Sequence, residues 1–284
     1  MPSLIDIRRR IRSVKNTQQI TKAMKMVSAA KLRRAQDRVI AARPYVATLR
    51  QVLANVASAA AGGEDAGTNP LLEQRNERRI LLVLVTADKG LAGAFNSNLI
   101  RGAQRFITER RDAEVTLVLI GRKGRDFFRK RGARIAGDSM NFARPSYDDA
   151  RPFAHKAMDM YRDGETDAVY LLYNEFKSVV AQKIVLQRVL PVEVPEETQP
   201  ASYIFEEPPE QILHALVPRY VEMEFFRALL ETGAAEHAAR MTAMDAATSN
   251  AADMIDRLVL YMNRVRQASI TKEIIEVVSG AAAE

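Results

Sequence analysis

Cysteine and tryptophan are absent from this sequence of 284 residues, and histidine occurs three times, at His155, His214 and His237. Without cysteine the chain can form no disulfide, no thiolate metal site and no thiol nucleophile. The histidines are too scattered to indicate a metal cluster, so we expect neither a metal nor a cofactor. No run of 18 apolar residues occurs, and the sequence therefore predicts no membrane-spanning helix.

Aromatic residues are also scarce, at 6% of the chain, although hydrophobic residues reach 47%. The hydrophobic content argues against disorder. The shortage of aromatics favours thin seams of small and aliphatic side chains between paired helices over a thick globular core. The length allows one large domain or two modest ones.

The C-terminal segment carries an apolar seam whose positions advance in alternating steps of three and four residues. A mean step of about 3.5 residues keeps one stripe facing a partner helix in a left-handed coiled coil. Only a threonine breaks this seam, and its phase shifts towards the chain end, to Ile270, Ile274 and Val277. The seam consists of Met241, Met244, Thr248, Ala251, Ile255, Leu258, Met262 and Val265.

The N-terminal segment supplies a matching seam, interrupted by polar and Met-rich residues near Gln18. Before Gln18, a shorter run has the same spacing as the run over residues 32–56, and we expect the two runs to differ in phase. The shorter run consists of Leu4, Ile7, Ile11 and Val14. We expect Pro44 to bend the helix without ending it. At about 1.5 Å per residue, a helix over residues 3–59 extends roughly 85 Å. The N-terminal and C-terminal helices together therefore predict a long antiparallel rod, with an ordinary helical bundle as the alternative. The later run consists of Leu32, Ala35, Val39, Ala42, Val46, Leu49, Leu53 and Val56.

Between the two helical ends, short apolar runs alternate with helical patterns. This alternation predicts an α/β fold: a Rossmann-like, mostly parallel sheet with helices on both faces and an antiparallel last strand pair. We expect Pro218 to kink or break the last helix. The expected strands are 79–86, 115–120, 134–136, 168–173 and 179–189, and the expected helices are 97–111, 121–132, 147–162 and 211–279. The expected domains are an N-terminal coiled-coil helix (1–60), a central α/β domain (71–205) and a C-terminal coiled-coil helix (209–284) that pairs with the first.

No catalytic constellation is visible in the sequence. The Gly-rich turn 88–96 sits between a strand and a helix, as a phosphate loop does, but it lacks the spacing of a Walker A or GxGxxG motif, so we interpret it as a tight turn. The glycines of 121–125 are a weak anion-site candidate for the same reason. No nucleophile or base accompanies the carboxylate pairs at 148–149 and 206–207. We expect no enzymatic activity from this chain alone.

Positive charge is concentrated at the N-terminus, where the first fifty residues hold thirteen Lys and Arg against Asp6 and Asp37. A basic helix fits nucleic acid, anionic lipid or an acidic protein partner, or its charge is simply solvated. A basic coiled-coil nucleic-acid-binding protein is therefore an open alternative, although no aromatic residues interleave the clusters 8–12 and 31–38. A nucleotide-dependent oxidoreductase is less favoured, because the GxGxxG motif is absent.

Segments 7–36, 86–98, 239–255 and 266–282 together resemble the γ subunit family of F-type ATP synthases, and with the α/β middle the resemblance covers essentially the whole chain. The sequence departs from many relatives at Ala92, where they carry cysteine, and it lacks the cysteine insert of the chloroplast form. Thiol control of that kind is therefore not expected.

This resemblance implies a central rotor shaft. In the family, the coiled coil turns inside a ring of three α and three β subunits that hold the catalytic sites, and the α/β domain lies at the foot beside the ε subunit and the membrane-embedded c-ring. Proton flow through the ring drives rotation and so ATP synthesis. The resemblance further implies a non-catalytic subunit with no nucleic-acid partner, peripheral to the cytoplasmic face of a bacterial plasma membrane.

The resemblance also carries over interface residues by motif position. Met24 and Lys25 match shaft positions near an acidic loop of β, and Tyr203 and Glu206 match the foot near ε and the c-ring. The positions that match hydrogen-bonding contacts to α or β are Arg240, Gln267, Thr271 and Glu273.

Overall fold

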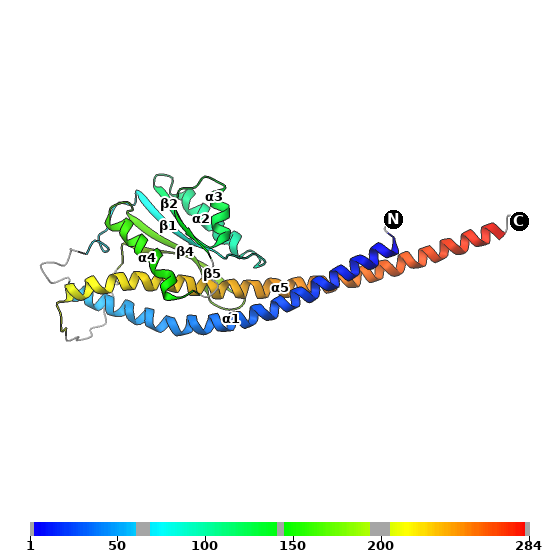
Figure 1. Ribbon diagram of the computed structural model, residues 1–284, viewed down its shortest axis with the longest axis horizontal. Helices are drawn as coiled ribbons and strands as arrows, with labels where there is room; N and C mark the ends of the chain where they lie inside the picture. The colour runs from blue at the N-terminus through cyan, green and yellow to red at the C-terminus, as the bar shows by residue number, and fades with distance from the viewer. Residues whose placement is uncertain (1–2, 61–68, 141–144, 194–204, 282–284) are drawn as a thin grey trace. The chain divides into compact units, whose positions relative to one another are not determined.

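The computed structural model describes residues 3–60, 69–140, 145–193 and 205–281. Two long helices, α1 and α5, enclose a central α/β region along the chain, as the sequence predicts (Figure 1). The strands are β1 (Arg79–Val85), β2 (Glu114–Ile120), β3 (Ile135–Ser139), β4 (Ala168–Phe176) and β5 (Gln182–Leu190). The helices are α1 (Leu4–Ala60), α2 (Phe95–Glu109), α3 (Arg122–Arg129), α4 (Tyr147–Arg162) and α5 (Pro209–Ala281).

The described residues divide into two compact units. The sheet unit contains Ala30–Ala239, and the helix-pair unit contains Met1–Ala29 with Arg240–Glu284. Both α1 and α5 contribute to each unit.

In the sheet unit, five strands form one sheet in the order β3-β2-β1-β4-β5. All neighbours are parallel except β4 and β5, which pair antiparallel. The mostly parallel sheet and its antiparallel edge pair confirm the predicted topology. The weak strand expected at 134–136 is longer than predicted, since β3 continues to Ser139.

The sheet is covered by helices on both faces, because its strands are apolar on both sides. One face packs against α4 and against the parts of α1 and α5 that lie in this unit, with residues such as Leu53, Tyr161 and Phe225 fully buried. On the other face α2 buries Leu99 and Phe106, and Figure 1 shows α2 beside α3 there. The helix pair is therefore part of the core that supports the sheet.

The seam predicted for residues 32–56 is the buried stripe of α1 in the sheet unit. Seven of its eight positions are buried, and Ala42 is intermediate. The helix α1 continues through Pro44, and α5 continues through Pro218, so neither proline breaks its helix.

The turn after β1 has the tight conformation that its glycines indicate. Gly93 has φ +56°, and its exposed neighbour Leu91 has φ +61°. The Asp88 carboxylate accepts a hydrogen bond of 2.9 Å from the Arg122 backbone N–H at the start of α3. Because the chain's own carboxylate lies at this helix N-terminus, the segment 121–125 is not available as an anion site.

Candidate functional site

In the helix-pair unit, α1 and α5 run antiparallel with a register that two polar contacts define. Thr21 Oγ1 lies 2.8 Å from Thr248 Oγ1, and Lys25 Nζ lies 2.6 Å from Asp245 Oδ1. Residue numbers therefore fall along one helix as they rise along the other. Counting outward from the threonine pair places Leu4 opposite Val265, so the described start of α1 meets the end of the predicted seam.

The α1 seam does not change phase, and our expectation of a different phase for residues 4–14 is wrong. The inward-facing positions continue from Val14 through Gln18, Thr21, Lys25 and Ser28 in unbroken steps of three and four. Thr21 and Ser28 are buried, at 8% and 3% exposure. The seam keeps its geometry and changes only its chemistry, becoming polar over two heptads.

The C-terminal seam is confirmed as the inward face of α5. Met244, Ala251 and Ile255 are buried, and the other five predicted positions are intermediate. Its one polar member, Thr248, contacts Thr21 of α1 across the seam. The polar residues that interrupt the two apolar seams therefore face each other. The Thr248 hydroxyl also lies 2.7 Å from the backbone oxygen of Met244.

The polar layer fixes the register of the helix pair. Hydrophobic contacts are non-directional and tolerate a slip by one heptad, whereas a slip would separate the two threonine hydroxyls and leave each with only a backbone oxygen of its own helix as partner. A polar seam residue specifies pairing in this way at a cost in stability. The Lys25–Asp245 pair adds at most about 1 kcal/mol, because both side chains are more than a third exposed.

We expect the double substitution Thr21→Val with Thr248→Val to raise the thermal stability of the full chain slightly and to loosen the register. Two matched apolar side chains would replace a polar pair that is buried at some cost, a gain of roughly 1 kcal/mol. Spin labels placed on both helices would report the register through their distance distribution, which should broaden. A single narrow distance in the double variant would contradict this role for the layer.

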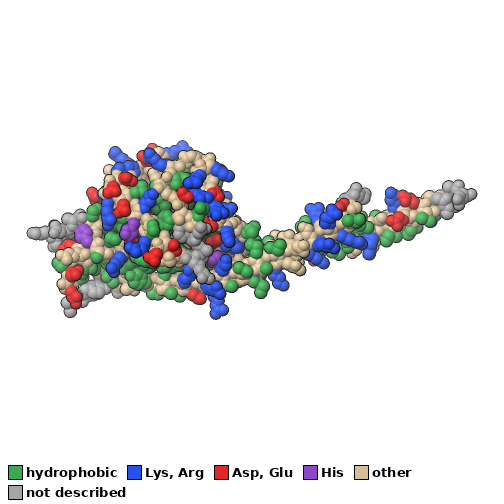
Figure 2. Space-filling view, viewed as in Figure 1, with side chains coloured by type: hydrophobic (Ala, Val, Ile, Leu, Met, Phe, Trp, Pro, Cys, Tyr) green, Lys and Arg blue, Asp and Glu red, His purple; other side chains and the backbone are tan. Residues whose placement is uncertain are grey.

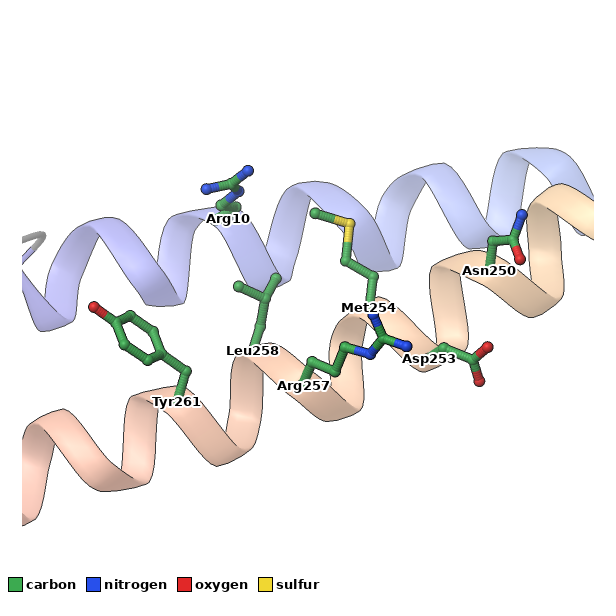
Figure 3. A pocket seen from close by; sticks show the side chains of 7 residues that line it. All are labelled: Arg10, Asn250, Asp253, Met254, Arg257, Leu258 and Tyr261. Atoms are coloured by element: carbon green, nitrogen blue, oxygen red, sulfur yellow. The ribbon is translucent and has the colours of Figure 1, made fainter.

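An open groove lies on the side of the helix pair between Arg10 of α1 and Tyr261 of α5 (Figure 3). Its volume is about 580 Å³. Figure 3 shows Met254 and Leu258 between the two helices, with Asp253 and Arg257 next to them on α5. These side chains supply charge and apolar surface without a nucleophile beside a base, so the groove suits contact with another molecule better than chemistry.

Beyond Val265, α5 continues without a described α1 residue opposite it, as Figure 1 shows. Residues 270–279 of this segment are all exposed. Apolar side chains contribute much of this surface, and the segment shows no buried face within its own unit. The large exposed apolar residues here are Ile270, Ile274, Ile275, Val277 and Val278. A helical surface of this kind marks a site that another protein covers.

Basic side chains gather on the paired part of the same unit (Figure 2). Within α1, Arg8, Arg9, Arg10, Arg12 and Lys15 are all exposed. The helix-pair unit thus presents a cationic paired segment followed by an apolar single helix.

The predicted ring-contact residues all lie in the helix-pair unit. Met24 and Lys25 are half-buried beside the polar layer, and Arg240 is buried at 9% exposure. Gln267, Thr271 and Glu273 are exposed on the single-helix segment. The Thr271 hydroxyl donates to the backbone oxygen of Gln267 at 2.9 Å, and Glu273 accepts from Ser269 at 3.3 Å.

Of the two predicted foot residues, the structure describes one. Glu206 is exposed in a bend just before α5, in the sheet unit. Tyr203 lies outside the described residues. Sequence reasoning missed Asp245 as the partner of Lys25, although counting the 3–4 steps through the polar stretch would have placed Lys25 in the seam.

Over the described parts of the chain, no three His, Asp or Glu side chains come together in a way that could hold a metal ion. Within the same residues, no helix is both long enough and apolar enough to cross a bilayer.

Comparison with known proteins gives matches along essentially the whole length. A family model described as ATP synthase matches residues 3–283. The chain is 69% identical to the ATP synthase gamma chain of Solibacter usitatus, over 100% of this chain and 99% of the relative. It is 50% identical to the ATP synthase gamma chain of Pelotomaculum thermopropionicum, with the same coverage.

Solved structures show the same similarity. A chain in the central stalk and c-ring structure of Tetrahymena thermophila mitochondrial ATP synthase has a TM-score of 0.65 and 26% identity, covering 80% of this chain and 99% of that one. A chain in the OSCP/F1/c-ring structure of Euglena gracilis mitochondrial ATP synthase has a TM-score of 0.70 and 18% identity, covering 99% and 94%. The second match shows a shared fold.

Proposed function

This chain belongs to the ATP synthase gamma chain family, and from that premise we propose that it is the central rotor shaft that couples proton-driven rotation of a c-ring to the catalytic sites of a ring of α and β subunits. It is a subunit of a membrane-bound complex. The comparisons lend no support to the alternative of a nucleic-acid-binding protein.

The observation that carries this proposal is the apolar single-helix end of α5. A row of exposed isoleucine and valine side chains on one helix is typical of a surface that a protein partner covers. A ring of three α and three β subunits that encloses the end of the helix supplies that surface. The paired segment next to it supplies stiffness, because its seam is continuous and its polar layer opposes slip.

The proposed contacts divide by unit. In the helix-pair unit, the α and β subunits contact the cationic paired segment and the single helix. In the sheet unit, Glu206, together with Tyr203, contacts the ε subunit and the c-ring. The ring-contact residues are Met24, Lys25, Arg240, Gln267, Thr271 and Glu273. Functionally, residues 1–60 and 209–284 then form the shaft and residues 71–205 the foot domain.

We infer that the chain performs no chemistry itself and needs no cofactor. The Asp148–Asp149 pair has a structural role, since Asp149 takes part in a capping box with Ser146 at the start of α4 and Asp148 lies 3.9 Å from Arg151. The complex would hold the chain at the cytoplasmic face of a bacterial plasma membrane, without a membrane segment of its own.

Reconstitution tests the proposal directly. The α and β subunits from the same source would be assembled with and without this chain, and ATP hydrolysis would be measured. We expect a stable complex with three α, three β and one copy of this chain, and turnover that depends on the chain. A folded chain that stays free in solution would overturn the proposal.

The double substitution Gln267→Ala with Thr271→Ala tests the proposed contacts. Both side chains are exposed, so we expect the free energy of unfolding to change by less than about 0.5 kcal/mol. Each hydrogen bond to the ring that is lost should lower turnover roughly fivefold, from about 1 kcal/mol apiece. Lys272→Ala is the matched control on the same turn. Equal turnover in the double variant and the wild type would remove these residues from the interface.

A further inference from the structure

A buried carboxylate joins the two long helices to the sheet in the sheet unit. The Glu231 side chain of α5 is 1% exposed and forms a two-pronged ion pair with Arg43 of α1, at 2.9 Å to Nε and 3.1 Å to Nη2. The same two side chains hydrogen-bond to the backbone of Phe176, the last residue of β4. Arg43 Nη2 donates to the Phe176 backbone oxygen at 2.7 Å, and the Phe176 N–H donates to Glu231 Oε2 at 2.9 Å.

This arrangement, which we call the Arg43–Glu231 clamp, satisfies every oxygen of the buried carboxylate. It also satisfies both backbone groups of Phe176, which ends its strand. Charge-assisted bonds in a bidentate pair are short, strong and directional. Three segments that lie far apart in the sequence are thereby held at one point.

The clamp lies where the apolar contact between helices and sheet ends. The core that joins them uses α1 residues from Val46 onward and α5 residues up to Leu229. Arg43 and Glu231 come next along each helix, within one turn. Further along, the buried residues Val39 of α1 and Ala234 of α5 do not belong to that core.

This position matters for a shaft under torque. Apolar packing resists separation of the helices from the sheet, but it is non-directional and resists sliding only weakly. When the helices are twisted, the strain is largest where their contact with the sheet ends. A directional polar contact at that point opposes rotation of the sheet about the helix pair.

We propose that the Arg43–Glu231 clamp transmits torque between the foot domain and the shaft, by fixing the angle of the sheet on the helix pair. Arg43 and Glu231 are positioning residues, since they act through the Phe176 peptide and touch no substrate. This inference rests on the rotor-shaft function proposed above.

The test uses the assembled complex with a bead attached to the foot domain. The chain contains no cysteine, so Lys130→Cys creates a single attachment point at an exposed position after α3. With the ring fixed to a surface, the angular spread of the bead is recorded during each pause in ATP-driven rotation. We expect Arg43→Ala and Glu231→Gln to widen that spread while unloaded ATP hydrolysis continues at the wild-type rate.

Arg43→Ala should also lower Tm by roughly 10 °C, because it leaves the buried Glu231 carboxylate without its cation, whereas Glu231→Gln should lower Tm less, because the Arg43 side chain is 43% exposed and stays solvated. The double variant Arg43→Ala with Glu231→Gln separates the two effects. It leaves no unpaired buried charge, so its Tm should recover in part, while its angular spread should stay wide. A spread that narrows as Tm recovers would show that the clamp is only structural, and would overturn the inference.

Arg79→Ala is the matched control. The Arg79–Asp167 pair is also two-pronged and its carboxylate is also buried, but it joins strand ends within the foot domain and touches neither long helix. A control spread as wide as that of the clamp variants would equally overturn the inference. If the wild-type complex does not assemble or rotate, the rotor-shaft function itself fails; wild-type rotation with unchanged clamp variants refutes the clamp alone.

Discussion

Gly121→Ala is expected to be strongly destabilising and to lower the melting temperature of the sheet unit far more than any other glycine substitution proposed for this chain. A Cβ at this position would lie 2.1 Å from the Thr86 backbone oxygen. The residue also has φ +97°, a conformation that L side chains rarely adopt. The oxygen belongs to the backbone, so relief requires movement of β1 or β2. The cost should exceed about 4 kcal/mol, and circular dichroism on heating would measure it.

Two other glycines serve as controls for the Gly121 experiment. Gly132 has φ +64° with nothing within 4 Å of the added Cβ, so Gly132→Ala isolates the backbone cost, about 1 kcal/mol. Gly233 lies inside α5 with open space around it, and Gly233→Ala should stabilise the chain by about 0.5–1 kcal/mol. Equal melting temperatures for Gly121→Ala and Gly132→Ala would contradict this prediction, because they would show that β1 and β2 can move apart without loss of stability.

Asp167→Asn is expected to cost roughly 3 kcal/mol and to flatten the dependence of stability on acidic pH. The Asp167 carboxylate is buried and accepts the Arg78 and Arg79 backbone N–H groups as well as the Arg79 guanidinium. An amide can accept fewer of these bonds and turns its own donors towards them. The energy comes from this loss of acceptors at the start of β4.

The pH effect has a definite sign. Hydrogen bonds from the Arg79 guanidinium lower the pKa of Asp167 below its ordinary value, and burial opposes them only in part. A carboxylate with a lowered pKa in the folded state stabilises the fold above its unfolded pKa, and this stability is lost as pH falls through the folded pKa. The free energy of unfolding, measured by denaturant titration at a series of pH values below 6, should therefore fall less steeply with pH for Asp167→Asn than for the wild type. Asp112→Asn, at an exposed loop position, is the control; parallel curves for all three proteins would contradict the assignment.

Much of the fold follows from sequence patterns because the patterns are local. A continuous apolar run such as 80–85 predicts a strand covered on both faces, and the helical pattern of 147–162 predicts α4 with the bounds that the structure has. The step of three and four residues likewise predicts which side of α5 faces inward, through Val265. These features depend on neighbours in the chain, and the structure contains them almost residue for residue.

The rest depends on residues that come together only in the folded chain. Nothing in the sequence pairs Arg43 with Glu231, which are 188 positions apart. The polar residues near Gln18 predict a change of seam phase, whereas the helix geometry carries Thr21 inward whatever its side chain. The contacts of Gln267 and Thr271 are predicted by resemblance alone, since their partners belong to other chains.

The one-to-one register of the helix-pair unit couples the two ends of the gene. Along the paired length, each α1 residue faces the α5 residue that lies the same number of positions from Thr248 as it lies from Thr21. An insertion or deletion within 4–28 displaces every facing pair beyond it, unless an equal change occurs within 241–265. We therefore expect a change of length in one segment to be matched by an equal change in the other, although more than two hundred codons separate them.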